Sequence, residues 1–483
     1  MFERSAGVLL NVSSLPSPYG IGGFGEETHH FVNLLSKMGM AWWQILPLCP
    51  VGEGNSPYTS VSAFAINPLY VDIDSLIQDG YLEDGESQLF LYAGGPHQVD
   101  FTLVKQSKSR AMRLAFSRAN KSDYASFVQE QEGWLDHYAR FMAGKVANGD
   151  KGWWEWETEG QTEDYDYYCF EQYVLYQQWK RVKDYANEKG IRIFGDMPIY
   201  VSLDSADVWG NRALFQLDET AKPTQVAGVP PDYFTSDGQL WGNPLYNWDK
   251  MKQDGYQWWV SRIGAALKLY DAVRIDHFRG FYQYWAVPAD ATTAQTGHWE
   301  NGPGMDLFSR INQQFQNPPI IAEDLGVSDD GLVAFLAQTG YPGMRVMQFG
   351  FAQGEKGHLP HGYHHNTVAY TGTHDNDTLL GWLWSASQEE RERLLEYCRF
   401  EGGDWGQGGP NSPAIRSIVT TLWQSAADIT ILPMQDICGF GTDTRINIPG
   451  VPEGNWGFRF TRQALDSADT GFYRHLNQLY GRI

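Results

Sequence analysis

The sequence predicts an α/β fold, a (β/α)8 TIM barrel with large insertions after the second and third strands. Eight short apolar runs are spread along the chain, and amphipathic helical stretches lie between several of them. This alternation is typical of a parallel sheet covered by helices. The length of 483 residues also suits one large barrel that carries insertions. A doubly wound open sheet remains the alternative, because periodicity does not show whether the sheet closes.

The eight expected strands are apolar, contain β-branched residues, and end in polar residues or turn formers. Their nearly continuous apolar character indicates burial on both faces, as in a parallel sheet covered by helices. They lie at residues 7–12, 42–48, 191–196, 272–276, 319–324, 344–349, 367–375 and 429–436.

Helical periodicity marks segments that follow several of these strands. One helix is expected after the first strand, one each after the fourth and fifth, and two after the seventh. They lie at residues 29–39, 305–315, 329–340, 388–400 and 414–426.

Two intervals between the strands are too long for ordinary connections. About 140 residues separate the second strand from the third and about 75 separate the third from the fourth, against a usual 2 to 6. The first interval contains amphipathic stretches at 106–119, 127–142 and 166–190. We therefore expect one catalytic barrel over 1–483, with a mainly helical inserted subdomain at 50–190 and inserted substrate-binding loops at 200–268.

Composition narrows the class of partner. Apolar residues make up 42% and charged residues 19% of the chain, as in a folded globular protein. A formal charge of −22 would repel nucleic acid and anionic membrane surfaces. Aromatic residues reach 14%, with 19 Trp and 26 Tyr, which favours stacking surfaces for sugar rings. The negative net charge is also what an acidic surface would show if it were simply solvated and had no specific partner.

The cysteines and the N-terminus favour a cytoplasmic protein. Cys49, Cys169, Cys398 and Cys438 lie far apart without a CxxC pair, so we expect reduced thiols rather than disulfides or a metal site. The first twenty residues contain no apolar run long enough for a secretory signal, and no segment approaches the ~18 apolar residues of a membrane span. We expect no metal and no cofactor.

Three of the expected strands end in acids, namely Asp276, Glu323 and Asp375. In a barrel, side chains at the carboxyl ends of the strands point into one cleft. Any one of these acids could instead cap the helix that follows it. Three such acids after sharply apolar segments favour a catalytic site.

The spacing around these acids suggests opposite protonation states. Residues two apart in a strand share a face, so Arg274 should lie beside Asp276 and keep it ionised. Glu323, at the end of the next strand, is placed for partial desolvation beside other carboxylates, which favours its protonated form. A carboxylate and a carboxylic acid on adjacent strand ends are what retaining glycosidic cleavage requires.

A series of motifs extends this interpretation along the whole chain. In order they are SLPSPYGIG at 14–22, SPYTSVSAFAINP at 56–68, GDMPIYV at 195–201, GVPPDYF at 228–234, GQLWGNPLYNW at 238–248, VRIDHFRGF at 273–281, AEDLG at 322–326 and GTHDNDT at 372–378. The series resembles the amylomaltases, or 4-α-glucanotransferases, which belong with the α-amylase group of barrels. A lone R-x-D would be weak evidence, whereas the ordered series is specific.

The resemblance implies a role for each of the strand-end acids. Asp276 would be the nucleophile, Glu323 the general acid and then base, and Asp375 the carboxylate that holds the distorted sugar. Arg274 and His374 would orient groups around the donor sugar.

The resemblance also implies further substrate-binding residues. Asp196 would line the donor site, with a purely structural hydrogen-bonding role as the alternative. Tyr58 would stack near the cleaved sugar, while aromatic side chains and an amide would guide the acceptor chain. These acceptor residues are Tyr233, Phe234, Trp241 and Asn243, and each could instead pack its own loop.

The function implied is retaining transfer of α-1,4-glucan segments to the 4-hydroxyl of glucose or a malto-oligosaccharide. Malto-oligosaccharides and glucans from starch or glycogen would be the partners. Two alternatives remain at this point: an α-amylase-like hydrolase that uses the same three acids, and a noncatalytic glucan-binding protein. The sequence does not indicate the oligomeric state.

Overall fold

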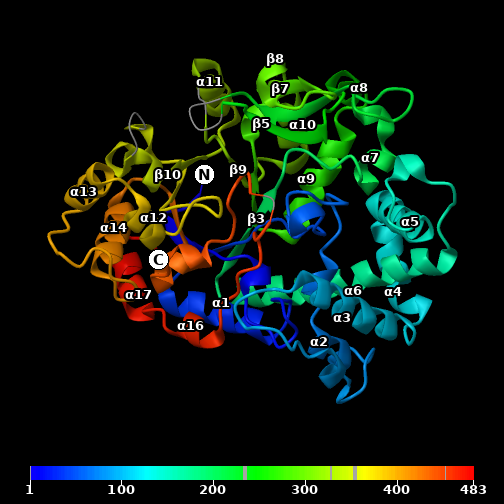
Figure 1. The fold of residues 1–483 in the computed structure, drawn as a ribbon, viewed down its shortest axis with the longest axis horizontal. Coiled ribbons are helices and arrows are strands. Elements are labelled where there is room, and N and C mark those ends of the chain that lie inside the picture. The colour runs from blue at the N-terminus through cyan, green and yellow to red at the C-terminus, as the bar shows by residue number, and fades with distance from the viewer. Residues whose placement is uncertain (1, 232–235, 327–328, 352–355, 452) are drawn as a thin grey trace.

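A closed parallel sheet forms the centre of the computed structural model, which describes residues 2–231, 236–326, 329–351, 356–451 and 453–483 (Figure 1). Within these residues the sheet has eight strands in the order β10-β11-β12-β1-β2-β3-β6-β9, and each neighbouring pair in this order is parallel. The strands are β1 (Ser5–Leu9), β2 (Trp42–Gln44), β3 (Arg192–Met197), β6 (Ala272–Ile275), β9 (Ile320–Ala322), β10 (Gly343–Val346), β11 (Thr367–Tyr370) and β12 (Ile429–Pro433).

Two observations show that the sheet closes into a barrel. The backbone N–H of Ala322 in β9 donates to the carbonyl of Pro342, directly before β10, at 2.9 Å. One buried cluster also draws side chains from all eight strands, including Leu9, Trp42 and Phe194. An open sheet would leave its edge strands apart, so the barrel prediction is confirmed and the doubly wound alternative is excluded.

Helices cover the outside of the barrel. Each of the eight predicted apolar runs overlaps a strand of the barrel, and each predicted helix has a counterpart in the structure. The helices outside the two insertions are α1 (Glu26–Met38), α10 (Gly304–Phe315), α11 (Asp330–Thr339), α12 (Leu379–Ser385), α13 (Gln388–Tyr397), α14 (Pro413–Gln424), α15 (Met434–Cys438), α16 (Arg462–Asp466) and α17 (Thr470–Leu479).

The segment between β2 and β3 is rich in helices, which lie together beside the barrel (Figure 1). Its longest member, α6, runs back to β3 and packs against α1 and α9 as well as α5. The helices are α2 (Ile73–Gln78), α3 (Phe101–Phe116), α4 (Lys121–Glu130), α5 (Glu132–Ala147) and α6 (Thr162–Glu188).

The segment between β3 and β6 contains more than loops. Two of its strands pair with two strands that follow β6, and together they form an antiparallel sheet in the order β5-β4-β7-β8. The sequence pattern did not indicate this second sheet. The elements are α7 (Ala206–Gly210), β4 (Gln225–Val229), β5 (Gln239–Pro244), α8 (Trp248–Gln253), α9 (Gln257–Leu269), β7 (Gln283–Pro288) and β8 (His298–Asn301).

The four cysteines carry free thiols, and Cys169, Cys398 and Cys438 are buried. None of the helices in the described ranges is both long and apolar enough to span a bilayer. Within the same ranges, no three or more His, Cys, Asp or Glu residues gather in a way that could hold a metal ion.

Candidate active site

The three predicted acids lie at one end of the barrel. Asp276 follows β6 directly, Glu323 follows β9 directly, and Asp375 lies on the loop after β11. Because all the strands are parallel, these positions share the carboxyl edge of the sheet. The two segments that carry Asp276 and Glu323 are also joined, since the N–H of Glu323 donates to the carbonyl of Ile275 at 3.1 Å.

Arg274 forms a fork between two carboxylates. Its Nη1 donates to both oxygens of Asp196 at 2.8 and 2.7 Å, and its Nη2 donates to Oδ1 of Asp276 at 2.6 Å. Burial alone would lower the pKa of Arg274, but the charges of Asp196 and Asp276 outweigh it and raise that pKa well above its ordinary value. The predicted contact between Arg274 and Asp276 is confirmed, and it is a charge-assisted hydrogen bond.

Gly195 lets β3 lie close to Tyr270, and this position of the strand brings Asp196 beside Arg274. Asp196 points into the barrel, so Gly195 faces outward, where the ring of Tyr270 lies against it. A Cβ at this position would lie 2.2 Å from ring atoms of Tyr270. Only glycine therefore allows this close approach between β3 and the chain that enters β6.

Glu323 is in a different environment. Removal from water, together with the negative charge of Asp276, raises its pKa to about 8 from an ordinary 4.5. Backbone N–H groups of His277 and Leu325 donate to its two oxygens at 2.8 and 2.7 Å, which opposes this rise but also fixes the orientation of the carboxyl group. This raised pKa favours the protonated form of Glu323 at neutral pH.

The N–H of His277 reaches Glu323 because the backbone turns sharply after Asp276. His277 has a φ of 52°, in the left-handed region that few residues other than glycine adopt. Such conformations cost on the order of 1–3 kcal/mol and occur often at functional sites. In this protein the turn lets His277, the residue directly after Asp276, donate its backbone N–H to Glu323.

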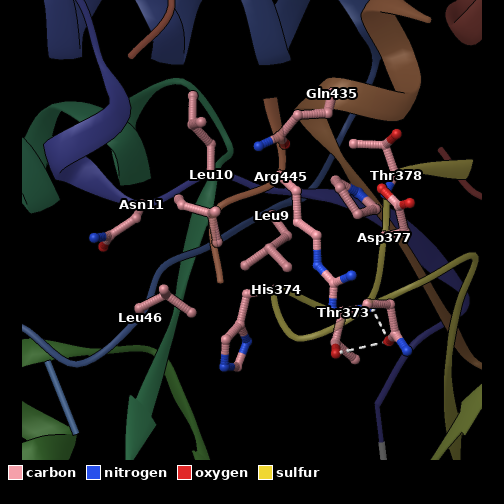
Figure 2. A pocket seen from close by; sticks show the side chains of 13 residues that line it. Leu9, Leu10, Asn11, Leu46, Thr373, His374, Asp377, Thr378, Gln435 and Arg445 are labelled. Carbon is pink, nitrogen blue, oxygen red and sulfur yellow. Dashed lines mark hydrogen bonds between the residues drawn. The ribbon is translucent and has the colours of Figure 1, made fainter. Parts of the chain in front are cut away.

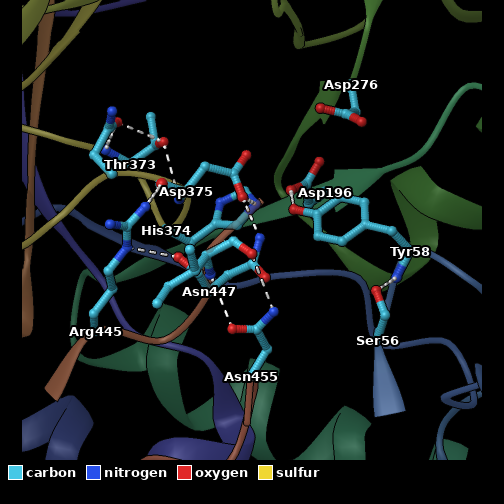
Figure 3. A network of polar contacts seen from close by, with 12 residues as sticks. Ser56, Tyr58, Asp196, Asp276, Thr373, His374, Asp375, Arg445, Asn447 and Asn455 are labelled. Carbon is cyan, nitrogen blue, oxygen red and sulfur yellow. Dashed lines mark hydrogen bonds and ion pairs between the residues drawn. The ribbon is translucent and has the colours of Figure 1, made fainter. Parts of the chain in front are cut away.

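Asp375 is held by the segment after β12 (Figure 3). Asn447 donates from Nδ2 to Oδ1 of Asp375 at 2.6 Å, and Arg445 donates from Nη2 to its backbone carbonyl at 2.5 Å. The Asp375 side chain remains 45% exposed, so it faces the open cleft. His374 lies beside it, with Nε2 3.3 Å from Oδ1.

Aromatic rings form one wall of the site (Figure 3). The ring of Tyr58 stacks on that of His374, with centroids 5.2 Å apart and planes 11° apart. Trp456 packs against both rings, at 5.9 and 6.1 Å. The Tyr58 hydroxyl donates to Oδ2 of Asp196 at 2.6 Å, so this wall and the Arg274 fork share one carboxylate.

The predicted acceptor residues have mixed placements. Trp241 is 37% exposed and directs its ring at the edge of His277, with centroids 4.8 Å apart. Asn243 donates from Nδ2 to the carbonyl of Val201 at 3.0 Å, which ties β5 to the chain after β3. The predicted residues Tyr233 and Phe234 lie outside the described ranges.

A pocket opens beside His374 at the same end of the barrel (Figure 2). Its lining includes Leu9 and Asn11 from the end of β1, Leu46 after β2, and Arg445. His374 therefore stands between this pocket and the aromatic wall. Sequence analysis missed Arg445, Asn447 and Trp456, which lie in a segment without strand or helix pattern.

Comparison with known proteins decides the family. A model of the 4-alpha-glucanotransferase family matches residues 10–465 of the chain. The chain belongs to the 4-alpha-glucanotransferase family. It is 40% identical to a 4-alpha-glucanotransferase of Clostridium butyricum over 496 residues, covering 98% of this chain and 100% of that protein. It is also 41% identical to one of Thermus thermophilus over 484 residues, covering 94% of each chain.

A solved member of the 4-alpha-glucanotransferase family confirms the fold. The amylomaltase from Streptococcus agalactiae in complex with acarbose superposes with a TM-score of 0.93 at 38% identity, covering 99% of this chain and 100% of that one. The resemblance, the barrel and the enzyme class predicted from the sequence are therefore confirmed. This chain is a 4-alpha-glucanotransferase by family.

Proposed function

We propose that Asp276 and Glu323 carry out retaining transfer of α-1,4-glucan segments in this chain. The observation that carries the proposal is their opposite environment. Arg274 stabilises a negative charge on Asp276, whereas burial and the charge of Asp276 keep Glu323 protonated. A carboxylate held by a cation and a carboxylic acid beside it are what acid-assisted nucleophilic attack on a glycosidic bond requires.

In the first half of the reaction, a carboxylate oxygen of Asp276 attacks the anomeric carbon of the donor. The bond from that carbon to the glycosidic oxygen breaks, and Glu323 gives its proton to the departing oxygen. The reducing-end part of the donor leaves as an alcohol, and the rest remains as a β-linked ester of Asp276. Glu323 is then a carboxylate, ready to act as a base.

In the second half, Glu323 removes the proton from the 4-hydroxyl of an acceptor sugar. The acceptor oxygen attacks the anomeric carbon from the face that the leaving group vacated, and the ester bond to Asp276 breaks. An α-1,4 linkage is thus remade, and Glu323 recovers its proton. Water in the acceptor position would give hydrolysis instead.

The remaining residues orient the donor sugar around this pair. Asp375, held by Asn447 but still open to the cleft, would bind hydroxyls of the distorted sugar together with His374. Tyr58 would offer a ring face already aligned by its stack on His374. Asp196 has no exposed side-chain surface, so we assign it to holding Arg274 and Tyr58 rather than to direct sugar contact.

Transfer rather than hydrolysis requires that the acceptor site favours sugar over water. The exposed ring of Trp241, next to His277, would be one stacking surface there. Tyr233 and Phe234 would be further stacking residues, and Asn243 would hold β5 against the chain after β3 through its bond to Val201. Closing a site with such aromatic groups lowers the access of water to a reactive intermediate.

We propose malto-oligosaccharides and α-1,4-glucans derived from starch or glycogen as the substrates, with no metal or cofactor in the reaction, and the cytoplasm as the compartment. The glucan class follows from the family. The experiment is an incubation of the purified protein with maltotriose, with the products separated by chain length over time. Glucose together with maltopentaose and longer chains is the expected result. Glucose and maltose alone would mean a hydrolase, and no products from folded protein would mean a binding protein.

A further inference from the structure

Two adjoining hollows lie on the outside of the barrel, away from the carboxylates. One, of about 480 Å³, lies between α5, α7 and α9. The other, of about 540 Å³, lies between α5 and the end of α7. His137 on α5 lines both, so the two hollows adjoin at this side chain, and we name the pair the outer groove. Each hollow has the size of an ordinary ligand site.

Helix α9 separates the outer groove from the barrel interior. Gln257, Ser261 and Lys268 line the groove and recur at helical spacing on one side of α9. Trp259 and Ile263 lie on the opposite side and are fully buried, where α9 packs against β3 and β6. The groove is therefore a surface site on the far side of α9 from the active site.

Tryptophan side chains contribute much of the lining. Trp134 and Trp258 line the first hollow and Trp209 lines the second. Trp134 is held by stacking on Phe64, at 6.2 Å and 9°, and by a bond from its Nε1 to Gln131 at 2.9 Å. Rigid indole rings beside polar groups are the surfaces that sugar rings stack against. This combination favours a carbohydrate over a purely apolar ligand.

One of these indoles carries an unused donor. Trp258 is 7% exposed, and its Nε1 has no hydrogen-bond partner among the described residues. Buried polar groups are nearly always paired, so this donor needs an acceptor from elsewhere. The nitrogen itself is buried, so a small acceptor such as a water at the base of the hollow would reach it, and a sugar hydroxyl would bond to that water.

The charges of the groove favour a neutral ligand. Its solvent-accessible lining balances the acids Glu130, Asp136 and Asp254 with the bases Arg140, Arg212 and Lys268, although the chain as a whole carries −22. Two of these groups are already paired, because Arg140 donates to Asp136 from Nε at 2.9 Å. Neither an anion nor a cation would therefore gain from this surface, whereas a neutral polyhydroxylated chain would.

We propose that the outer groove is a second binding site for α-glucan chains, distinct from the catalytic cleft. The ligand class rests on the proposed function, since the active site would produce and consume such chains. A long glucan that is held at the groove raises the effective concentration of its other segments at the cleft. A short glucan that occupies only one site gains nothing from this tethering.

The test fills the groove without removing any packing. Ser261 is exposed on α9 and lines the first hollow, so Ser261→Trp adds bulk there and leaves the core intact. The matched control is Ser109→Trp, at another exposed serine within a helix, α3, outside the groove. We expect Ser261→Trp to raise KM for amylose about fivefold and to leave kcat and KM for maltotriose unchanged. The control should change neither substrate.

An unchanged KM for amylose in Ser261→Trp would overturn the proposal. An equal rise for amylose and maltotriose would also overturn it, because the block would then act on the cleft. A binding measurement keeps this test independent of turnover. Calorimetry of maltoheptaose with Asp276→Asn protein should show two sites, and the double variant Asp276→Asn, Ser261→Trp should show one. One site in both proteins would contradict a second site even if transfer activity is proven.

Discussion

The carboxyl group of Glu323 makes the stability of the protein depend on pH. Its pKa is raised to about 8 from 4.5, so the folded chain binds this proton more tightly than the unfolded chain. The stabilisation is fully present below pH 4.5 and is lost as the pH rises towards and through 8. Glu323→Gln replaces the protonated acid with an uncharged group of the same shape and removes this dependence.

The size of the effect follows from the pKa shift. At ~1.4 kcal/mol per unit, the shift amounts to about 5 kcal/mol for a fully buried group. Glu323 is only half-buried, so we expect about half of that. Unfolding entropy of ~2.1 cal/mol/K per residue gives about 1 kcal/mol/K for a chain of this length. Above pH 8 the variant should therefore unfold about 2 to 3 °C higher than the wild type.

Thermal unfolding of wild type and Glu323→Gln from pH 4.5 to 9 measures this difference. The gap in Tm should widen between pH 4.5 and 8 and stay constant above. The same pKa predicts that wild-type kcat/KM for maltotriose falls above pH 8, because about 90% of Glu323 is protonated at pH 7 and little remains by pH 9. A gap in Tm that does not depend on pH, or an alkaline limb near pH 5, would refute the assignment of Glu323 as the acid.

Three further predictions concern the groups that hold the site. Asn447→Ala removes the 2.6 Å hydrogen bond to Asp375. Because this bond is made to a charged group, its loss should lower kcat/KM for maltotriose about 10- to 100-fold, with little change in Tm. An unchanged kcat/KM would rule out a positioning role for Asn447. Arg274→Lys cannot bridge Asp196 and Asp276 at once and should lower kcat/KM at least ~100-fold together with Tm, from ~3–5 kcal/mol for a broken buried pair. Near-normal activity of this variant would mean that the fork is not needed. Tyr58→Phe keeps the stack on His374 and loses only the hydroxyl bond to Asp196, so it should cost less than ~10-fold in kcat/KM, whereas Tyr58→Ala should cost more; equal losses would contradict a role for the ring.

The barrel could be predicted because its strands are local patterns. Each strand is a short apolar run that is buried on both faces of the sheet, and such runs are easy to recognise in the sequence. The small antiparallel sheet could not be predicted in this way. Its strand β5 is mostly exposed and contains Gly242 and Pro244, while β4 pairs with β7 across more than fifty residues. Neither feature leaves a periodic signal.

The residues of the candidate site also fall into those that a local sequence pattern predicts and those that it does not. Asp276 and Glu323 stand directly after strands, so the end of an apolar run points to them, and the i, i+2 rule places Arg274 beside Asp276. The contact from Asn447 to Asp375 joins residues 72 apart through a single side chain in an irregular loop. No residue type or spacing in the sequence predicts such a contact. The end of the predicted strand at 367–375 and the resemblance to amylomaltases both pointed to Asp375, but neither indicated Asn447, which holds it.

The central claim is that Asp276 becomes covalently bonded to the transferred glucan. Glu323→Gln protein incubated with an α-maltosyl fluoride tests it most directly, because fluoride leaves without an acid and the missing base slows release of the ester. Intact-mass measurement should show one added maltosyl group, and peptide mapping should place it on Asp276. An adduct on another residue, or rapid turnover of the fluoride to α-linked products with no adduct at any time, would contradict the account.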